Sequence, residues 1–256
     1  MSLNRIALAA AALLAITAGG TAPPPLRIAA AADLRFAMED LVKAFQQGHS
    51  GVEVEPVYGS SGNFYAQLQN HAPFDVFLSA DVGYPRQLAR QGLIVPGSEF
   101  TYAVGRIVVW ARRDSGIDVA LLKTEALRHR SVRHIAIANP QHAPYGRAAE
   151  AALRTLGLYD EVQDKLVMGE NVAQTFQMVQ SGAADVGIVA LSLALAPGVA
   201  GQGSSWEVPL DAYPRIQQGG AILSWAKDLE AARAFRTFLL GPEGRAILKR
   251  YGFSEE

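Results

Sequence analysis

The sequence predicts an α/β protein built from two units of similar size. Short apolar runs with strand character alternate with segments whose apolar residues recur at helical spacing. Small or polar residues stand at the junctions where a strand passes into a helix, and the whole pattern starts twice, at Leu26 and again after Trp110. This order is typical of parallel sheets covered by helices.

In the first unit, strands and helices alternate from Leu26 onward. Leu34, Met38 and Leu41 recur at helical spacing, so the first helix is expected to pack one apolar face on a sheet. The predicted strands cover residues 26–31, 52–57 and 75–79, and the predicted helices cover 34–47 and 63–69.

The second unit repeats the alternation after a long extended run at residues 100–110. Its predicted strands are 134–138, 165–168 and 184–189, and its predicted helices are 146–156 and 172–181. A late strand, 220–225, precedes two further helices, 228–240 and 242–251. No repeat of solenoid length recurs, so two globular units are expected.

Size and charge restrict the classes to which the chain can belong. With 256 residues, of which 50% are hydrophobic and 18% charged, it can bury a core and form one or two domains. A formal net charge of -1 shows no basic excess, so no nucleic-acid partner is expected. Because the sequence has no cysteine, it has neither disulfides nor a cysteine for lipid attachment.

Residues 1–22 have the pattern of a secretory signal peptide. Arg5 precedes the apolar stretch 6–18, which is shorter than the roughly 20 residues of a membrane-spanning helix. The alternative, a buried N-terminal helix, is less favoured because the stretch has no polar face. We expect cleavage within 18–22 and a soluble mature protein in the periplasm of a two-membrane bacterium.

The strand-to-helix junctions indicate an anion site. Helix N-termini offer free N–H groups and the positive end of the helix dipole, and the turn Gly59-Ser60-Ser61-Gly62 adds two hydroxyls. A purely structural alternative is that small residues permit tight turns while Asp33 and Ser61 cap helices. Because junctions in both units share this character, we favour a ligand held between the units. The junctions are 30–33, 59–62, 79–81, 139–146 and 169–172.

Catalytic motifs are not evident, so an enzyme is not expected. The sequence lacks the Gly-x-Ser-x-Gly, His-Glu-x-x-His, Walker and Rossmann patterns, and its histidines have no metal-ligand spacing. One alternative is an exported hydrolase or transferase with Ser61 as nucleophile, which needs a base such as Asp33 or His142 within reach. Another is a surface adhesin or assembly module, which would expose a large apolar patch.

The junction residues resemble those of the periplasmic molybdate-binding proteins of ABC transporters. The matching stretches are Ala-Ala-Ala-Asp-Leu at 30–34, the turn 59–62, Ala-Pro-Phe-Asp-Val-Phe-Leu-Ser-Ala-Asp at 72–81, residues 140–146, Val172, and 241–243 with 249–253. The resemblance implies a two-lobed periplasmic binding protein fold of type II, with a mostly parallel sheet in each lobe and the ligand cleft between lobes. Lobe 1 would comprise 26–104 plus 206–256, and lobe 2 would comprise 105–205.

The resemblance also implies the ligand and the residues that bind it. Ser61 would donate from its hydroxyl and N–H, Ala80 and Val172 from their N–H groups, and Tyr145 from its phenol. Supporting positions are Ser60, Asn171 and His142. Neutral donors at helix N-termini suit a small dianion. We therefore expect a monomer that binds molybdate or tungstate, without a cofactor or a protein-ligated metal cation, and that delivers the anion to an inner-membrane ABC permease.

Two positions depart from the family pattern. The tyrosine that some members carry after their Gly-Ile-Val strand is Ala190 here, and Tyr145 is expected to replace it. Asp33 stands where the family usually has a serine or threonine donor, and an ionised carboxylate only accepts hydrogen bonds. We favour a helix-capping role for Asp33, in which it turns away from the ligand. Alternatively, Asp33 accepts a proton from a ligand such as hydrogen phosphate or a phosphonate, or pairs with a cationic group.

Overall fold

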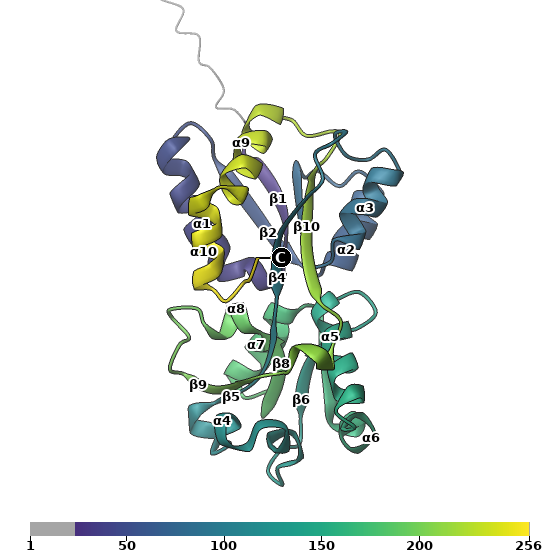
Figure 1. The fold of residues 1–256 in the computed structure, drawn as a ribbon, viewed down its shortest axis with the longest axis vertical. Helices are drawn as coiled ribbons and strands as arrows, with labels where there is room; N and C mark the ends of the chain where they lie inside the picture. The colour runs from purple at the N-terminus through teal and green to yellow at the C-terminus, as the bar shows by residue number, and fades with distance from the viewer. Residues whose placement is uncertain (1–23, 256) are drawn as a thin grey trace, which may run out of the picture.

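The computed structural model describes residues 24–255, so the predicted signal peptide at 1–22 lies outside the described residues. Two five-stranded sheets follow one another along the long axis of the molecule (Figure 1). We call the part built on the first sheet lobe 1 and the part built on the second sheet lobe 2. The predicted α/β class with two units is confirmed. Between residues 24 and 255 no helix has the length and apolar character needed to cross a bilayer.

The sheet of lobe 1 has the strand order β2-β1-β3-β10-β4. Its strands are β1 (Leu26–Ala31), β2 (Val54–Gly59), β3 (Val76–Ser79), β4 (Phe100–Gly105) and β10 (Ile216–Ile222). β1 pairs in parallel with β2 and β3, whereas β10 runs antiparallel to β3 and β4. The parallel register places Ala31 opposite Gly59, so the carboxyl ends of β1 and β2 lie side by side.

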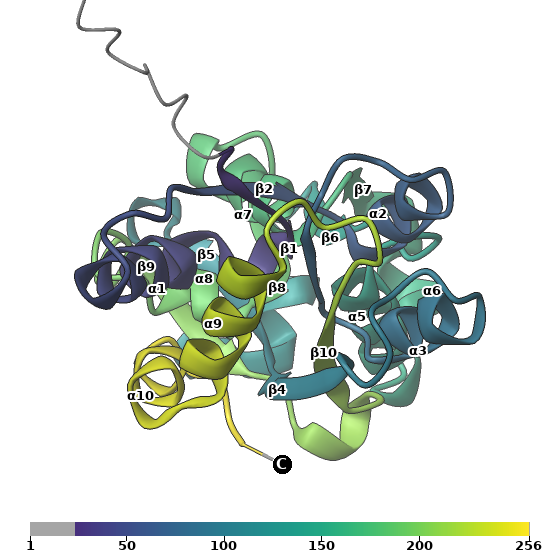
Figure 2. The ribbon, with the colours of Figure 1, turned by 90° about the horizontal axis from the view of Figure 1, so that it is seen from above.

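Helices cover both faces of this sheet (Figures 1 and 2). One face carries α1 (Arg35–Gly48), α9 (Leu229–Leu240) and α10 (Pro242–Arg250), and the other carries α2 (Ser61–Leu68) and α3 (Gly83–Arg90). Met38 and Leu41 of α1 are fully buried, as is Leu88 of α3. Because both faces are buried, the strands are apolar along most of their length.

The sheet of lobe 2 has the same kind of order, β7-β6-β8-β5-β9. Its strands are β5 (Ile107–Arg112), β6 (Ile135–Ala138), β7 (Leu166–Gly169), β8 (Val186–Ala190) and β9 (Gly203–Glu207). Its helices are α4 (Val119–Leu122), α5 (Pro144–Thr155), α6 (Tyr159–Val162), α7 (Val172–Ser181) and α8 (Leu191–Ala194). β6 pairs in parallel with β7 and β8, and β5 runs antiparallel to β8 and β9. Short 3-10 helices are η1 (Ala32–Leu34), η2 (Arg113–Ser115), η3 (Lys123–Arg128), η4 (Gln163–Lys165) and η5 (Leu210–Ala212).

The structure corrects three boundaries. The extended run predicted at 100–110 is two strands in different sheets, because the chain passes from lobe 1 to lobe 2 at Arg106. β10 begins at Ile216 and not at 220, since the polar Gln218 is buried inside it and interrupts the apolar run from which a strand is predicted. β9 pairs with β5 through Glu207, so the sheet of lobe 2 extends past the predicted lobe boundary at 205.

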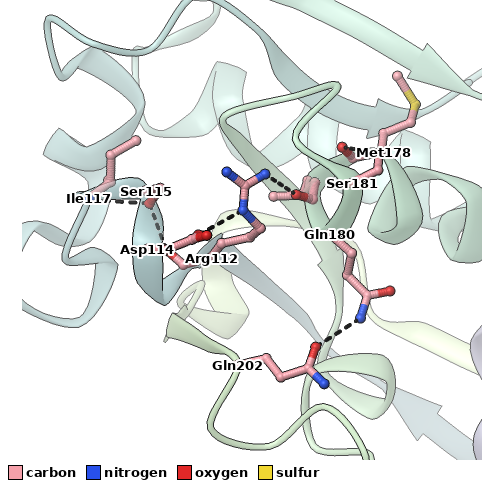
Figure 3. Close-up of polar contacts among 9 residues, drawn as sticks. Arg112, Asp114, Ser115, Ile117, Met178, Gln180, Ser181 and Gln202 are labelled. Carbon is pink, nitrogen blue, oxygen red and sulfur yellow. Dashed lines mark hydrogen bonds and ion pairs between the residues drawn. The ribbon is translucent and has the colours of Figure 1, made fainter.

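Arg112, at the end of β5, stabilises the C-terminal end of α7 (Figure 3). Its Nη1 donates to the carbonyl of Val179 at 3.3 Å, and its Nε donates to the carboxylate of Asp114 at 2.8 Å. A cation at the carbonyl end of a helix is favourable to the helix dipole. The N-terminal end of α7, at Val172, is the positive end of the helix dipole and can stabilise a negative charge.

Candidate functional site

A small cavity lies where the helix N-termini of the two lobes meet. All five residues predicted to bind the ligand line it, together with the predicted supporting residues Ser60 and Asn171. The lining residues are Ala31, Ala32, Asp33, Gly59, Ser60, Ser61, Ala80, Ala143, Pro144, Tyr145, Asn171 and Val172. Its free space is about 10 Å³, roughly enough for one water-sized sphere. The two walls are therefore closed on one another in this structure.

Ser61 is the inward-facing hydroxyl of lobe 1. Ser60 is the N-cap of α2, and its hydroxyl accepts a hydrogen bond from the N–H of Asn63 at 3.4 Å. Capping by Ser61, the structural alternative, is therefore wrong. Ser61 is 1% exposed, and its Oγ accepts the N–H of Ala80 at 2.9 Å. The Ala80 N–H was predicted to donate to the ligand, but here it donates to Ser61. The Ser61 hydroxyl only accepts in this hydrogen bond, so its own proton remains available for donation to a ligand.

Val172 is the corresponding donor of lobe 2. Asn171 is the N-cap of α7, and its Oδ1 accepts from the N–H groups of Ala173 and Gln174, each at 3.0 Å. The cap does not take the N–H of Val172, which is the first residue of the helix and is buried at the cavity wall. An N–H at this end of a helix is a favourable partner for an anion.

Asp33 lies in a buried hydrogen-bond network between the lobes. Its Oδ2 accepts the phenol of Tyr145 at 2.9 Å and the amide of Gln218 at 2.5 Å. Tyr102 in turn donates to Oε1 of Gln218 at 2.8 Å. Asp33 is 1% exposed and Gln218 is 0% exposed. The phenol of Tyr145 therefore contacts the Asp33 carboxylate here, instead of standing free for a ligand.

The favoured helix-capping role of Asp33 is wrong. α1 begins at Arg35 with no side-chain cap, because an extra 3-10 turn, η1, contains Asp33. The carboxylate instead meets two buried donors from distant parts of the chain, Gln218 on β10 and Tyr145 on α5. These contacts keep Asp33 at the cavity.

Burial raises the pKa of Asp33 to about 6, although the hydrogen bonds from Gln218 and Tyr145 act in the opposite direction. The nearby N–H groups of Asp33 and Leu34 also lower this pKa, and Oδ1 of the carboxylate has no hydrogen-bond partner. Burial, together with the nearby Asp33 carboxylate, raises the pKa of Tyr145 and of Tyr102 well above the usual tyrosine value. Both phenols are thus neutral donors at physiological pH.

Direct contacts between the lobes surround the cavity. The N–H of Gly62 donates to the carbonyl of His142 at 2.9 Å, and the Ser60 hydroxyl lies 2.9 Å from Nδ1 of the same histidine. Arg147 also crosses between the lobes and forms an ion pair with Asp81 at 2.6 Å. His142, predicted as a supporting residue, therefore contacts the opposite lobe and does not line the cavity. The Asp81–Arg147 pair was not predicted, since nothing in the local pattern links residues of different lobes.

The contacts of Ser61 do not support a nucleophile. Within residues 24–255, no imidazole or carboxylate is hydrogen-bonded to its Oγ, which only accepts from Ala80. His142 contacts Ser60 instead. Over the same residues there is also no group of three or more His, Cys, Asp or Glu side chains that could hold a metal ion.

A larger cavity of about 390 Å³ lies against α10, lined by residues such as Tyr102, Leu248 and Phe253. It holds none of the predicted ligand-binding residues. Its charged side chains include Arg245 and Glu255, which pair with each other at 3.6 Å. We therefore assign the candidate site to the smaller cavity between the lobes.

Two α/β lobes that are joined by crossing chain segments and closed over a polar cavity define a two-lobed solute-binding protein. A family model described as "Bacterial extracellular solute-binding protein" matches residues 26–254, and the chain belongs to this family. It is 41% identical over 254 residues to the molybdate-binding protein ModA of Azotobacter vinelandii, covering 98% of each chain. It is also 41% identical over 209 residues to the protein of that name from Rhodobacter capsulatus, covering 81% of this chain and 79% of the relative.

The solved structure of the Azotobacter vinelandii periplasmic molybdate-binding protein has the same fold. It superposes with a TM-score of 0.81 at 37% identity, covering 90% of this chain and 99% of the other. The predicted resemblance to periplasmic molybdate-binding proteins and the predicted fold class are confirmed. The relatives are named as binding proteins and not as enzymes.

Proposed function

We propose that the protein is the periplasmic solute-binding component of an ABC importer and that it binds molybdate or tungstate between its lobes. The observation that carries the proposal is the convergence of Ser61 of lobe 1 and Val172 of lobe 2 on one closed cavity. The relatives of the same length that are named for molybdate binding support the choice of anion.

The chemistry of the cavity suits a small tetrahedral oxyanion. The Ser61 hydroxyl and the Val172 N–H are neutral donors at the starts of α2 and α7, where the helix dipole stabilises negative charge. No lysine or arginine is among the described residues that line the cavity. Directed hydrogen bonds therefore replace the hydration shell of the anion without a fixed positive charge.

The wider assignment follows from this role. The protein would act as a monomer without a cofactor, catalytic activity or nucleic-acid partner, and would pass the anion to an inner-membrane permease. Lobe 1 would comprise residues 26–104 and the C-terminal part of the chain after β9. Lobe 2 would comprise the segment from residue 105 to the end of β9. Hinge motion at the crossings would open and close the cavity around the ligand.

A second candidate ligand is hydrogen phosphate or a phosphonate. The observation that favours it is the unpartnered Oδ1 of the buried Asp33, which could accept the proton of such a ligand. Molybdate and tungstate carry no proton, whereas hydrogen phosphate or a phosphonate would itself bring the proton that Asp33 accepts.

The ligand is tested by thermal shift over molybdate, tungstate, sulfate, phosphate and methylphosphonate. A ligand at 100 times its dissociation constant stabilises the folded state by about 2.7 kcal/mol, which corresponds to a Tm rise of about 5–10 °C for a chain of this size. We expect this rise with molybdate and tungstate. A rise with phosphate or methylphosphonate alone would select the second candidate, and no rise with any of the five anions would contradict the proposed function.

Removing the ion pair at the rim is expected to have a small effect. The side chains of Arg147 and Asp81 are 40% and 37% exposed, and exposed pairs contribute about 0–1 kcal/mol. Arg147→Met should therefore weaken molybdate binding by no more than about fivefold in calorimetry. Arg154→Met, which removes a pair within α5, is the control and should not change the affinity. A loss of 100-fold in Arg147→Met would show instead that this pair holds the lobes closed.

A further inference from the structure

Asp33 brings a negative charge into a cavity that is proposed to hold a dianion. Among the described residues that line the cavity, it is the only one with an ionisable carboxyl group, and no lysine, arginine or histidine accompanies it. Its two oxygens differ. Oδ2 accepts from Tyr145 and Gln218, whereas Oδ1 is buried and has no hydrogen-bond partner.

Among the described residues, no cation on the elements that pack against η1 forms a hydrogen bond or an ion pair with the Asp33 carboxylate. Tyr145 on α5 and Tyr102 on β4 are neutral, and α7 and α8 carry no titratable side chain. Ser192 of α8 donates to the backbone carbonyl of Asp33 at 2.8 Å and not to its carboxylate. The nearby titratable groups of α1 and β2 that influence one another are Arg35, Glu39 and Tyr58. None of these three has a hydrogen bond or ion pair with Asp33.

A dianion and an ionised carboxylate cannot bond to each other directly, because both only accept hydrogen bonds and both are negative. One proton between them removes the repulsion and supplies the missing hydrogen bond. Oδ1 is the oxygen available for that proton, since Oδ2 already receives two donors. Oδ1, which has no partner in this structure, would thus gain one in the complex.

We propose that the oxyanion is bound together with one proton, which is taken from solvent and shared between Oδ1 of Asp33 and an oxygen of the anion. This inference rests on the proposed function and deepens it, because it makes anion affinity depend on pH through one residue of the site. No covalent bond other than the O–H bond forms or breaks. The proton is counted in the binding equilibrium and is returned to solvent when the anion leaves.

The direction of the pH effect follows from the two states of Asp33. In the free protein its pKa is about 6, so the carboxyl group is largely ionised at pH 7 and above. In the complex the dianion raises that pKa further, so the proton is retained. Low pH therefore favours the complex. Proton uptake should rise toward one proton as the pH is raised above the pKa of the free carboxyl group, and the affinity should fall with rising pH, by at most about tenfold per pH unit.

The experiment is calorimetric titration of the wild-type protein with molybdate at pH 6, 7 and 8, in two buffers of different ionisation enthalpy. The difference in observed heat between buffers counts the protons taken up. Asp33→Asn keeps the shape of the side chain and offers an amide donor, so it should bind molybdate without proton uptake and with little pH dependence. Asp164→Asn, an exposed carboxylate far from the cavity, removes the same charge and should behave as wild type.

Wild-type binding without proton uptake at pH 8 would overturn the inference and leave the proposed function standing. Equal uptake in wild type and Asp33→Asn would also overturn it, because the proton would then belong to another group. If molybdate causes no heat at any pH, both the inference and the proposed function fail. Should Asp33→Asn not fold, Asp33→Ser serves as the second variant, and the wild-type measurement decides by itself whether a proton is taken up.

Discussion

Replacing Gly62 by alanine is expected to weaken molybdate binding by about 100-fold, because the lobes could no longer close fully. A Cβ at this position would lie 2.5 Å from the carbonyl oxygen of His142 and 2.9 Å from its Cα. These are backbone atoms of the opposite lobe, so they cannot turn away as a side chain would. Overpacking costs about 1–3 kcal/mol, and weakening the Gly62-to-His142 hydrogen bond adds about 1 kcal/mol.

The free protein should not lose stability from this substitution. Gly62 lies in the first turn of α2, and alanine is favoured over glycine in helices by up to about 1 kcal/mol. If the lobes open, no clash remains within lobe 1 except near the hydroxyl of Tyr84, which can move. We therefore expect an unchanged or slightly higher Tm without ligand, together with loss of the molybdate-induced rise.

Small-angle scattering and calorimetry test this together. Wild type should become more compact with molybdate, whereas Gly62→Ala should not. Gly48→Ala is the matched control, since a Cβ there has nothing within 4 Å. If Gly62→Ala bound molybdate with wild-type affinity, the closed arrangement of the lobes would not be the one that holds the ligand.

One topological rule explains why part of the candidate site could be predicted from sequence. The carboxyl ends of neighbouring parallel strands lie at one edge of a sheet, so residues that follow different strands converge there. The pairing of Ala31 with Gly59 is an instance, since it brings η1 and the start of α2 together. The rule acts within one sheet, so a ligand shared by both lobes was inferred from the common character of their junctions, and the choice of Ser61 and Val172 came from the resemblance to periplasmic molybdate-binding proteins.

Contacts between lobes could not be predicted in this way. Gln218 lies 185 residues from Asp33 in sequence, and its bond to that carboxylate depends on β10 returning to the sheet of lobe 1. The glutamine inside an otherwise apolar strand could have indicated a buried polar partner, but polar residues more often mark the end of a strand. For the same reason the expected cap at Asp33 was wrong, because local propensity does not include a distant buried partner.

Replacing Ser61 by alanine is expected to weaken molybdate binding by about 10–100-fold. The Ser61 hydroxyl is the proposed side-chain donor of lobe 1, and a hydrogen bond to a charged group contributes about 1.5–3 kcal/mol. The Ala80 N–H, which now donates to Ser61 Oγ at 2.9 Å, would be free to turn to the anion. This compensation sets the lower end of the range.

Unlike Gly62→Ala, this substitution should also lower the stability of the free protein. Ala80 is 2% exposed, and a buried N–H without a partner costs about 1–3 kcal/mol, so Tm should fall by several degrees. Ser98→Ala is the matched control, because Ser98 is also buried and bonds the backbone of Ile222 far from the cavity. It should lower Tm similarly but leave the affinity for molybdate unchanged. Calorimetry that found Ser61→Ala within about threefold of wild type would exclude the hydroxyl as a ligand donor, since a charge-assisted hydrogen bond is stronger than that difference.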